Sequence, residues 1–129
     1  MSLSLDSLNF ITLFTEDLEK SKRFYEDVFW LTLTWSNEDS AVYKLGEVYL
    51  NVLMIEQADE LINPTVVAGA NTGSRLQFTI TVDNVDDKFR QLADLGITPV
   101  NGPMDRPWGI RSMLISDPAG HLWELAHQL

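Results

Sequence analysis

The chain has no cysteine, which excludes disulfide frameworks, thiolate nucleophiles and cysteine-based zinc sites. Histidine is scarce as well, with two residues, His121 and His127. No apolar run approaches the roughly 20 residues that a membrane-spanning helix needs. The first residues, MSLSLD, lack the basic start and long apolar core of a signal peptide. We therefore expect a cytoplasmic protein without a membrane segment.

Basic residues are few, with 9 Lys and Arg against 19 Asp and Glu and a formal net charge of −10. Nucleic-acid binding depends on Lys and Arg that neutralise phosphates, so this balance argues against a nucleic-acid partner. The acids are scattered in twos and threes, which is typical of a solvated surface. Neither a Gly-x-Ser-x-Gly nucleophile turn nor a phosphate-binding glycine loop occurs.

Hydrophobic residues make up 45% of the chain, enough for a single globular domain over residues 1–129. One pattern of elements occurs twice within it, at about residues 8–55 and again at about 75–127. Between them, residues 56–73 are rich in Gly, Asn, Ala and Pro and predict a linker with one helical turn.

The first repeat reads as a strand, a helix and three strands, at residues 8–14, 15–29, 31–36, 40–45 and 48–55. Thr15 or Asp17 could cap the helix. The second repeat has the same order, at residues 75–82, 84–96, 97–100, 111–116 and 121–126. Residues 101–109 read as a long loop, in which Trp108 either packs beneath the loop, which is the favoured interpretation, or contacts a ligand.

Each repeat therefore forms a β-α-β-β-β module, which predicts an α+β fold. A four-stranded sheet with a single helix leaves one sheet face uncovered, so the two modules are expected to pair.

Two stretches, DLEKSKRFYEDVF (17–29) and WGIRSMLISDPAGHLWEL (108–125), resemble the glyoxalase / bleomycin resistance protein / extradiol dioxygenase superfamily, also called vicinal-oxygen-chelate proteins. The resemblance covers nearly the whole chain, and the late stretch is its specific part. It implies paired modules whose curved mixed sheets enclose a shared cavity, usually within a homodimer. Some members bind a divalent metal there with His, Gln or Glu from equivalent strands.

The end of the first helix departs from the family. Members commonly have Leu-Gly where this chain has Val28 and Phe29, followed by Trp30. Phenylalanine does not readily adopt a positive φ, so this helix must end in another way. Phe29 and Trp30 then either pack in the core or contact a neighbouring module or subunit.

The metal positions that the resemblance implies are poorly filled. The first-strand ligand falls on Phe10, which cannot coordinate a metal, and its second-repeat counterpart falls on Gln77. The last-strand carboxylate is Glu124, whose first-repeat counterpart is Leu50 or Asn51. A site with one carboxylate and one or two amides is a poor one for zinc, nickel or iron. We expect no metal cofactor; a divalent ion, if bound, would use Glu124 and Gln77.

Strand alternation places Leu122, Glu124 and Ala126 on one face of the last strand. If that face lines the cavity, Glu124 needs a partner, and Gln77 and Arg111 are the candidates. Alternatively, Glu124 is half-exposed at a sheet edge.

The favoured hypothesis is a metal-independent protein that binds a small organic molecule, partly aromatic or cationic, in the cavity between the modules. The expected ligand contacts are Glu124, Gln77, Asn51, Arg111, Trp108, Trp35 and Tyr43. The alternative is a metal-dependent lyase, isomerase or dioxygenase in which Glu124 shuttles a proton. A third possibility is an interaction module with a collapsed cavity.

Overall fold

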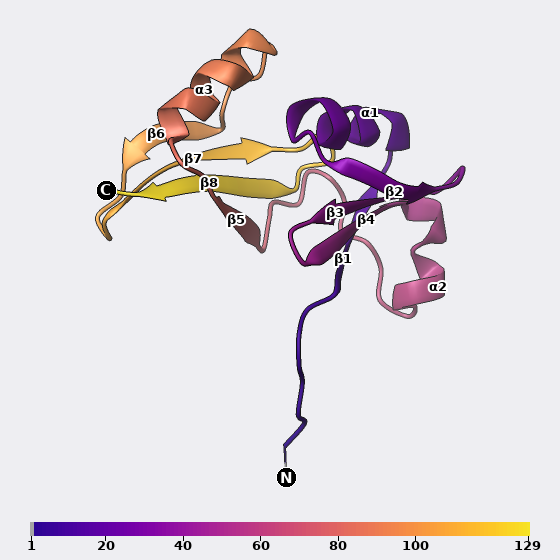
Figure 1. Cartoon of the computed structure of the whole chain (residues 1–129). Helices are drawn as coiled ribbons and strands as arrows, with labels where there is room; N and C mark the ends of the chain where they lie inside the picture. The colour runs from indigo at the N-terminus through magenta and orange to yellow at the C-terminus, as the bar shows by residue number, and fades with distance from the viewer. Residues whose placement is uncertain (1) are drawn as a thin grey trace. The chain divides into compact units, whose positions relative to one another are not determined.

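The structure, a computed structural model, describes residues 2–129 and divides into two compact units between Val67 and Ala68. Each unit holds a four-stranded mixed sheet with a helix on one face (Figure 1). The predicted α+β fold with two β-α-β-β-β repeats is therefore confirmed. Within residues 2–129, no helix has both the length and the apolar character needed to span a bilayer.

The first unit has the strand order β1-β4-β3-β2, in which β1 runs parallel to β4 and the other pairs are antiparallel. Its strands and helix are β1 (Phe10–Thr15), α1 (Leu18–Arg23), β2 (Thr32–Ser36), β3 (Ser40–Leu45) and β4 (Val48–Met54). Asp17 caps α1, because its side chain accepts from the Lys20 amide at 3.1 Å. Thr15 instead joins strand to helix through a 2.8 Å hydrogen bond to Ser21.

A π-helical turn, η1 (Phe24–Val28), extends α1 and explains how this helix ends without glycine. The turn inserts one residue, so the left-handed conformation falls on Trp30, at φ 57°, and Phe29 stays right-handed at φ −82°. The Leu31 amide closes the end by donating to the Tyr25 carbonyl. Phe29 packs on Phe24, with ring centroids 4.8 Å apart. Trp30 is 89% exposed, so of the two residues only Phe29 contributes to this aromatic cluster.

The second unit repeats the topology, with the strand order β5-β8-β7-β6 and β5 parallel to β8. Its elements are β5 (Gln77–Thr81), α3 (Val85–Asp94), β6 (Asn101–Asp105), β7 (Ile110–Ser116) and β8 (Leu122–Gln128). Asn84 caps α3 by accepting from the Asp87 amide, and Gly96 ends it at φ 76°. Val85 and Leu92 of α3 are buried, whereas Phe89 and Leu95 are 37% and 53% exposed.

The prediction for β6 was wrong. Residues 97–100 are not a strand; the strand is Asn101–Asp105, inside the predicted loop. Gly102 and Pro103 made this segment read as a loop, but an edge strand tolerates both residues. Gly102, at φ 83°, lies so close to β7 that an added Cβ would sit 2.6 Å from the Ser112 carbonyl oxygen. Only glycine therefore allows this strand pair to form.

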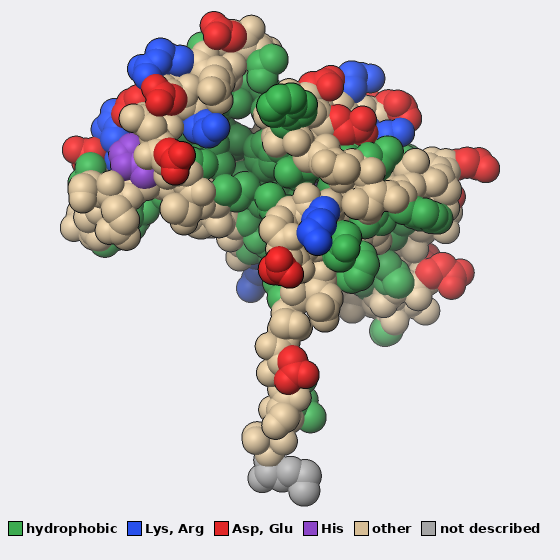
Figure 2. All heavy atoms as spheres, viewed as in Figure 1, with side chains coloured by type: hydrophobic (Ala, Val, Ile, Leu, Met, Phe, Trp, Pro, Cys, Tyr) green, Lys and Arg blue, Asp and Glu red, His purple; other side chains and the backbone are tan. Residues whose placement is uncertain are grey.

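In the sequence between β4 and β5, the predicted linker region holds a 3₁₀ turn, η2 (Ile55–Gln57), and a four-residue helix, α2 (Asp59–Ile62). The segment 2–9 forms no helix or strand. On the visible face of the molecule, acidic side chains are dispersed rather than gathered, as the sequence predicted (Figure 2).

Candidate functional site

Each sheet has one face that its own helix covers and one that it does not; the latter is called the open face here. In the second unit, Phe78, Trp123 and Leu125 point toward α3, while Thr79 and Glu124 alternate onto the open face. The strands thus place polar side chains on the open face and packed apolar side chains on the helix side of the sheet.

Glu124 lies on β8, an interior strand, which removes the alternative of a carboxylate at a sheet edge. It pairs in register with Thr79 on β5, and the Thr79 hydroxyl donates to Glu124 Oε1 at 2.8 Å. The partner of the carboxylate is therefore Thr79. Sequence reasoning missed it, although the alternation of Gln77, Thr79 and Thr81 with Phe78 and Ile80 carries the signal.

Asn51 is the first-repeat counterpart of Glu124. It pairs with Thr12 on β1, as Glu124 pairs with Thr79 on β5, and its amide donates to Thr12 Oγ1 at 3.4 Å. Leu50 points to the helix side of the first sheet and is fully buried. The choice between the two residues is therefore settled in favour of Asn51.

Phe10 stands on the open face of the first sheet at the family's first-strand metal position. Its ring stacks on Tyr49, with centroids 5.2 Å apart, and the Lys44 ammonium lies 5.6 Å from the centre of the Tyr49 ring. This position provides an aromatic surface with a cation beside it and offers no atom that could bind a metal.

The donor set does not fit a divalent metal. Within residues 2–129, no three His, Cys, Asp or Glu side chains cluster as ligands. Gln77 shares the open face with Glu124 but is paired with Leu122, two pairs along from Thr79 and Glu124, and no hydrogen bond joins Gln77 to Glu124 in this part of the chain. One carboxylate with amides lacks the strong nitrogen or oxygen ligands that catalytic sites use.

Both histidines take part in local structure. His121 Nδ1 lies 2.7 Å from the buried carboxylate of Asp117, whose other oxygen accepts from the His121 amide. His127 lies within β8, on the helix side of the sheet, and its Nδ1 accepts from the Val85 amide at 2.8 Å.

Arg111 was expected beside Glu124, but it lies on the opposite, helix-facing side of the second sheet. Its guanidinium donates two hydrogen bonds to Asp86, at 2.8 and 2.9 Å, and one to Asp105. These bonds hold the pKa of Asp86 below its usual range and raise that of Arg111. Arg111 therefore joins β6, β7 and α3 and does not reach the Glu124 face.

Tyr43 also points to the helix side, where it is fully buried. Its hydroxyl donates to Glu26 Oε2 at 2.6 Å. Burial raises the pKa of Tyr43 above its ordinary value, and the hydrogen bond to the Glu26 carboxylate raises it further. The residue is a core and helix contact rather than a wall of the open face.

The two tryptophans predicted as ligand contacts are exposed. Trp35 pairs with Val42 on the open face of the first sheet and is 55% exposed. Trp108, expected to pack beneath its loop, is 69% exposed in the turn between β6 and β7.

Arg106 is a second residue that sequence reasoning missed. It opens the turn before β7, and its guanidinium donates to Ser112 Oγ and Asn101 Oδ1, both at 2.7 Å. Ser112 and Asn101 belong to the open face that carries Glu124. No sequence signal distinguishes this arginine from the others, because the strand before it, β6, reads as a loop in the sequence.

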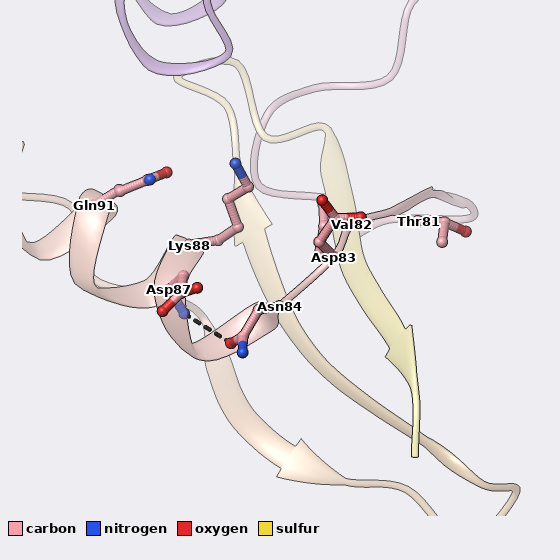
Figure 3. Close-up of a pocket in the computed structure, with 7 residues that line it drawn as sticks. All are labelled: Thr81, Val82, Asp83, Asn84, Asp87, Lys88 and Gln91. Carbon is pink, nitrogen blue, oxygen red and sulfur yellow. Dashed lines mark hydrogen bonds between the residues drawn. The ribbon is translucent and has the colours of Figure 1, made fainter.

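A separate polar hollow of about 390 Å³ lies where β5 meets the start of α3 (Figure 3). Its lining residues are Thr81, Val82, Asp83, Asn84, Asp87, Lys88 and Gln91. Asn84 is engaged in capping α3, and Asp87 pairs with Arg90. The hollow has no aromatic wall, so we do not assign the ligand site to it.

Comparisons with known proteins agree with this architecture. The Glyoxalase/Bleomycin resistance protein/Dioxygenase superfamily model matches residues 7–125. An uncharacterised Bacillus subtilis protein, YraH, is 30% identical over 125 residues, covering 92% of this chain and 96% of that protein. The metallothiol transferase FosB of Lysinibacillus sphaericus is 26% identical over 95% of this chain and 82% of its own.

A solved glyoxalase/bleomycin resistance protein/dioxygenase from Nocardioides superposes with a TM-score of 0.87 at 24% identity, covering 99% of this chain and 87% of that chain. A lactoylglutathione lyase from Agrobacterium tumefaciens superposes with a TM-score of 0.76 at 23% identity, covering 96% and 95%. At this identity the two structures show the shared fold.

Proposed function

Because the chain belongs to the glyoxalase/bleomycin resistance protein/dioxygenase superfamily, we propose that it binds a small organic molecule without a resident metal ion. The observation that carries the proposal is the stack of Phe10 on Tyr49. An aromatic pair stands where the family places its first metal ligand, so the position favours contact with an organic ligand over coordination.

Glu124 supplies a polar contact on the open face of the second sheet. Thr79 holds one carboxylate oxygen, Oε1, and no hydrogen bond to Oε2 is recorded from residues 2–129. The second oxygen can therefore accept from a hydroxyl, amide or amine of the ligand. Gln77, on the same face, adds an amide that can donate or accept.

A partly aromatic ligand is favoured by the rings on the open face of the first sheet. Tyr49 and Phe10 form one aromatic surface and Trp35 another, and each ring offers a flat face for stacking. Small-molecule sites commonly combine such apolar walls with a few fixed polar groups.

The test is a thermal-shift screen of small organic molecules against metal-stripped protein in the presence of a chelator. We expect compounds that raise the Tm of the wild type and act less on Glu124→Gln, which keeps the shape and loses the charge. Thr81→Val is the matched control, because Thr81 follows on the same strand and face. Stabilisation that appears only after a divalent cation is added would replace this proposal with the metal-dependent enzyme, which the retained Glu124 and the glutamine Gln77 on the same face support.

We further propose that the protein acts in the cytoplasm as a homodimer. Its family resemblance and the open face of each sheet support dimerisation. Light scattering during size-exclusion chromatography should give twice the 14.6 kDa of one chain. A mass of one chain across the micromolar range would contradict the dimer.

A further inference from the structure

Arg106 is fixed in place by neutral groups. Its Nε donates to Ser112 Oγ at 2.7 Å, its Nη2 to Asn101 Oδ1 at 2.7 Å and its Nη1 to Met104 Sδ at 2.8 Å. The backbone holds the residue as well, since the Arg106 amide donates to the Ile110 carbonyl and the Gly109 amide to the Arg106 carbonyl. The guanidinium is therefore oriented before any ligand arrives.

The positive charge of Arg106 is not neutralised within the described chain. The ion pairs among residues 2–129 involve Arg90, Arg111 and His121, and none includes Arg106. A guanidinium has five N–H groups, of which the three neutral acceptors take three. One N–H on each terminal nitrogen remains for a further acceptor.

The three acceptors place Arg106 on the same open face as Glu124. Asn101 on β6 pairs with Leu114 on β7, and Leu114 pairs with Glu124 on β8. Adjacent strands lie about 4.8 Å apart, so Asn101, one of the three acceptors of Arg106, lies two strand spacings, about 10 Å, from Glu124. Leu114 lies between them and provides apolar surface.

We propose that Arg106 binds an anionic group of the ligand, a carboxylate or a phosphate-type oxyanion. The inference rests on the proposed function and adds the class of ligand, an organic anion. Guanidinium groups match both oxyanions well. The unneutralised charge of Arg106 therefore favours an anion over a cationic compound on this face.

The experiment compares three aromatic probes of similar size: benzoate, phenylphosphonate and the neutral benzyl alcohol. Each is titrated into the full chain at constant ionic strength, with chloride as the control ion, and the apparent Kd is taken from thermal shift and calorimetry. The variants are Arg106→Gln, Arg106→Lys and the matched control Arg90→Gln, whose arginine pairs with Asp87 on the surface of α3.

We expect at least one anion to bind the wild type more tightly than benzyl alcohol. Arg106→Gln should weaken that anion about tenfold or more, Arg106→Lys less, and Arg90→Gln not at all. The anion that binds more tightly indicates whether Arg106 prefers a carboxylate or a phosphate-type oxyanion. Because Arg106 also holds Ser112 and Asn101, Arg106→Gln can lower the Tm by itself, and the retained charge of Arg106→Lys separates that effect from anion binding.

Equal binding of all three probes, or an anion affinity that Arg106→Gln leaves unchanged, would overturn the role of Arg106 while leaving the proposed organic-ligand site intact. Absence of a response to every probe up to tens of millimolar would count against both proposals.

Discussion

The Thr79 hydroxyl donates a 2.8 Å hydrogen bond to Glu124 Oε1 across the parallel pair of β5 and β8. The same register position in the first unit joins Thr12 and Asn51. The two repeats thus keep the threonine and differ in its partner, a carboxylate in one and an amide in the other. A hydroxyl that donates to the carboxylate fixes one oxygen and leaves the other for a ligand.

Replacement of Thr79 by Val should remove this bond and keep the side-chain shape. We expect the free energy of unfolding to change by about 1 kcal/mol or less, since one partly exposed hydrogen bond is lost. Affinity for a ligand that uses Glu124 should fall several-fold, as measured by calorimetric titration with the best compound of the screen. Thr81→Val should leave that affinity unchanged; equal losses in the two variants would contradict a specific role for Thr79.

Replacement of Trp30 by Gly should stabilise the protein. Trp30 is held at φ 57° while its side chain is 89% exposed. The left-handed conformation is unfavourable by about 1–2 kcal/mol for an ordinary residue. The greater freedom of glycine in the unfolded chain offsets about 0.4–1 kcal/mol of the relief. Urea denaturation should show a gain of up to about 1.6 kcal/mol.

The control in the opposite direction is Gly96→Ala, at the corresponding end of α3, where φ is 76° and open space surrounds an added Cβ. This variant should lose about 1 kcal/mol, because only the backbone conformation opposes the methyl group. A destabilised Trp30→Gly would mean that the indole makes contacts that outweigh its backbone strain.

Acid should weaken the junction of β7 and α3 through Asp86. Its hydrogen bonds from Arg111 hold its pKa below the ordinary value of about 3.9. A carboxyl group with a lowered pKa in the folded state contributes stability above its unfolded pKa and loses it as the pH falls through the folded value. Asp86→Asn should therefore show a smaller loss of stability than the wild type between pH 5 and strong acid. Denaturation curves across that range test this, with exposed Asp94→Asn as the control; equal acid losses in Asp86→Asn and the wild type would contradict it.

Replacement of Tyr43 by Phe should affect stability and leave ligand binding unchanged. The hydroxyl donates to Glu26 on the helix side of the first sheet, away from the open face. Loss of that bond should lower the free energy of unfolding by about 1 kcal/mol. A variant of unchanged stability and weakened binding would place Tyr43 in the site after all.

Much of the fold could be predicted from the sequence because hydrophobic alternation and helical periodicity are strong in β1, β4, β8 and α3. The strand β6 could not, since Gly102 and Pro103 are turn residues whose close fit against β7 is a tertiary property. The π-helical turn was likewise hidden, although the missing glycine at Phe29 indicated that the helix ends differently.

The site could be predicted only in part. Alternation correctly placed Glu124 and Gln77 on one face. Arg111 shares its side of β7 with Met113 and Ile115, and this apolar pattern could have placed it against α3. The carboxylates that bind Arg111 come from α3 and β6, and Arg106 depends on the position of β6, so neither set of contacts follows from local sequence.

The central claim, that an organic ligand binds without a resident metal, is tested most directly by thermal unfolding of metal-stripped protein. The wild type and Glu124→Ala are each measured alone and with Mn²⁺, Fe²⁺, Ni²⁺, Zn²⁺ or Mg²⁺. An ion held only by the folded state would add about 2.7 kcal/mol at a hundredfold excess over its Kd. We predict no rise in Tm with any ion. A clear rise in the wild type that Glu124→Ala abolishes would contradict the account and make Glu124 a metal ligand.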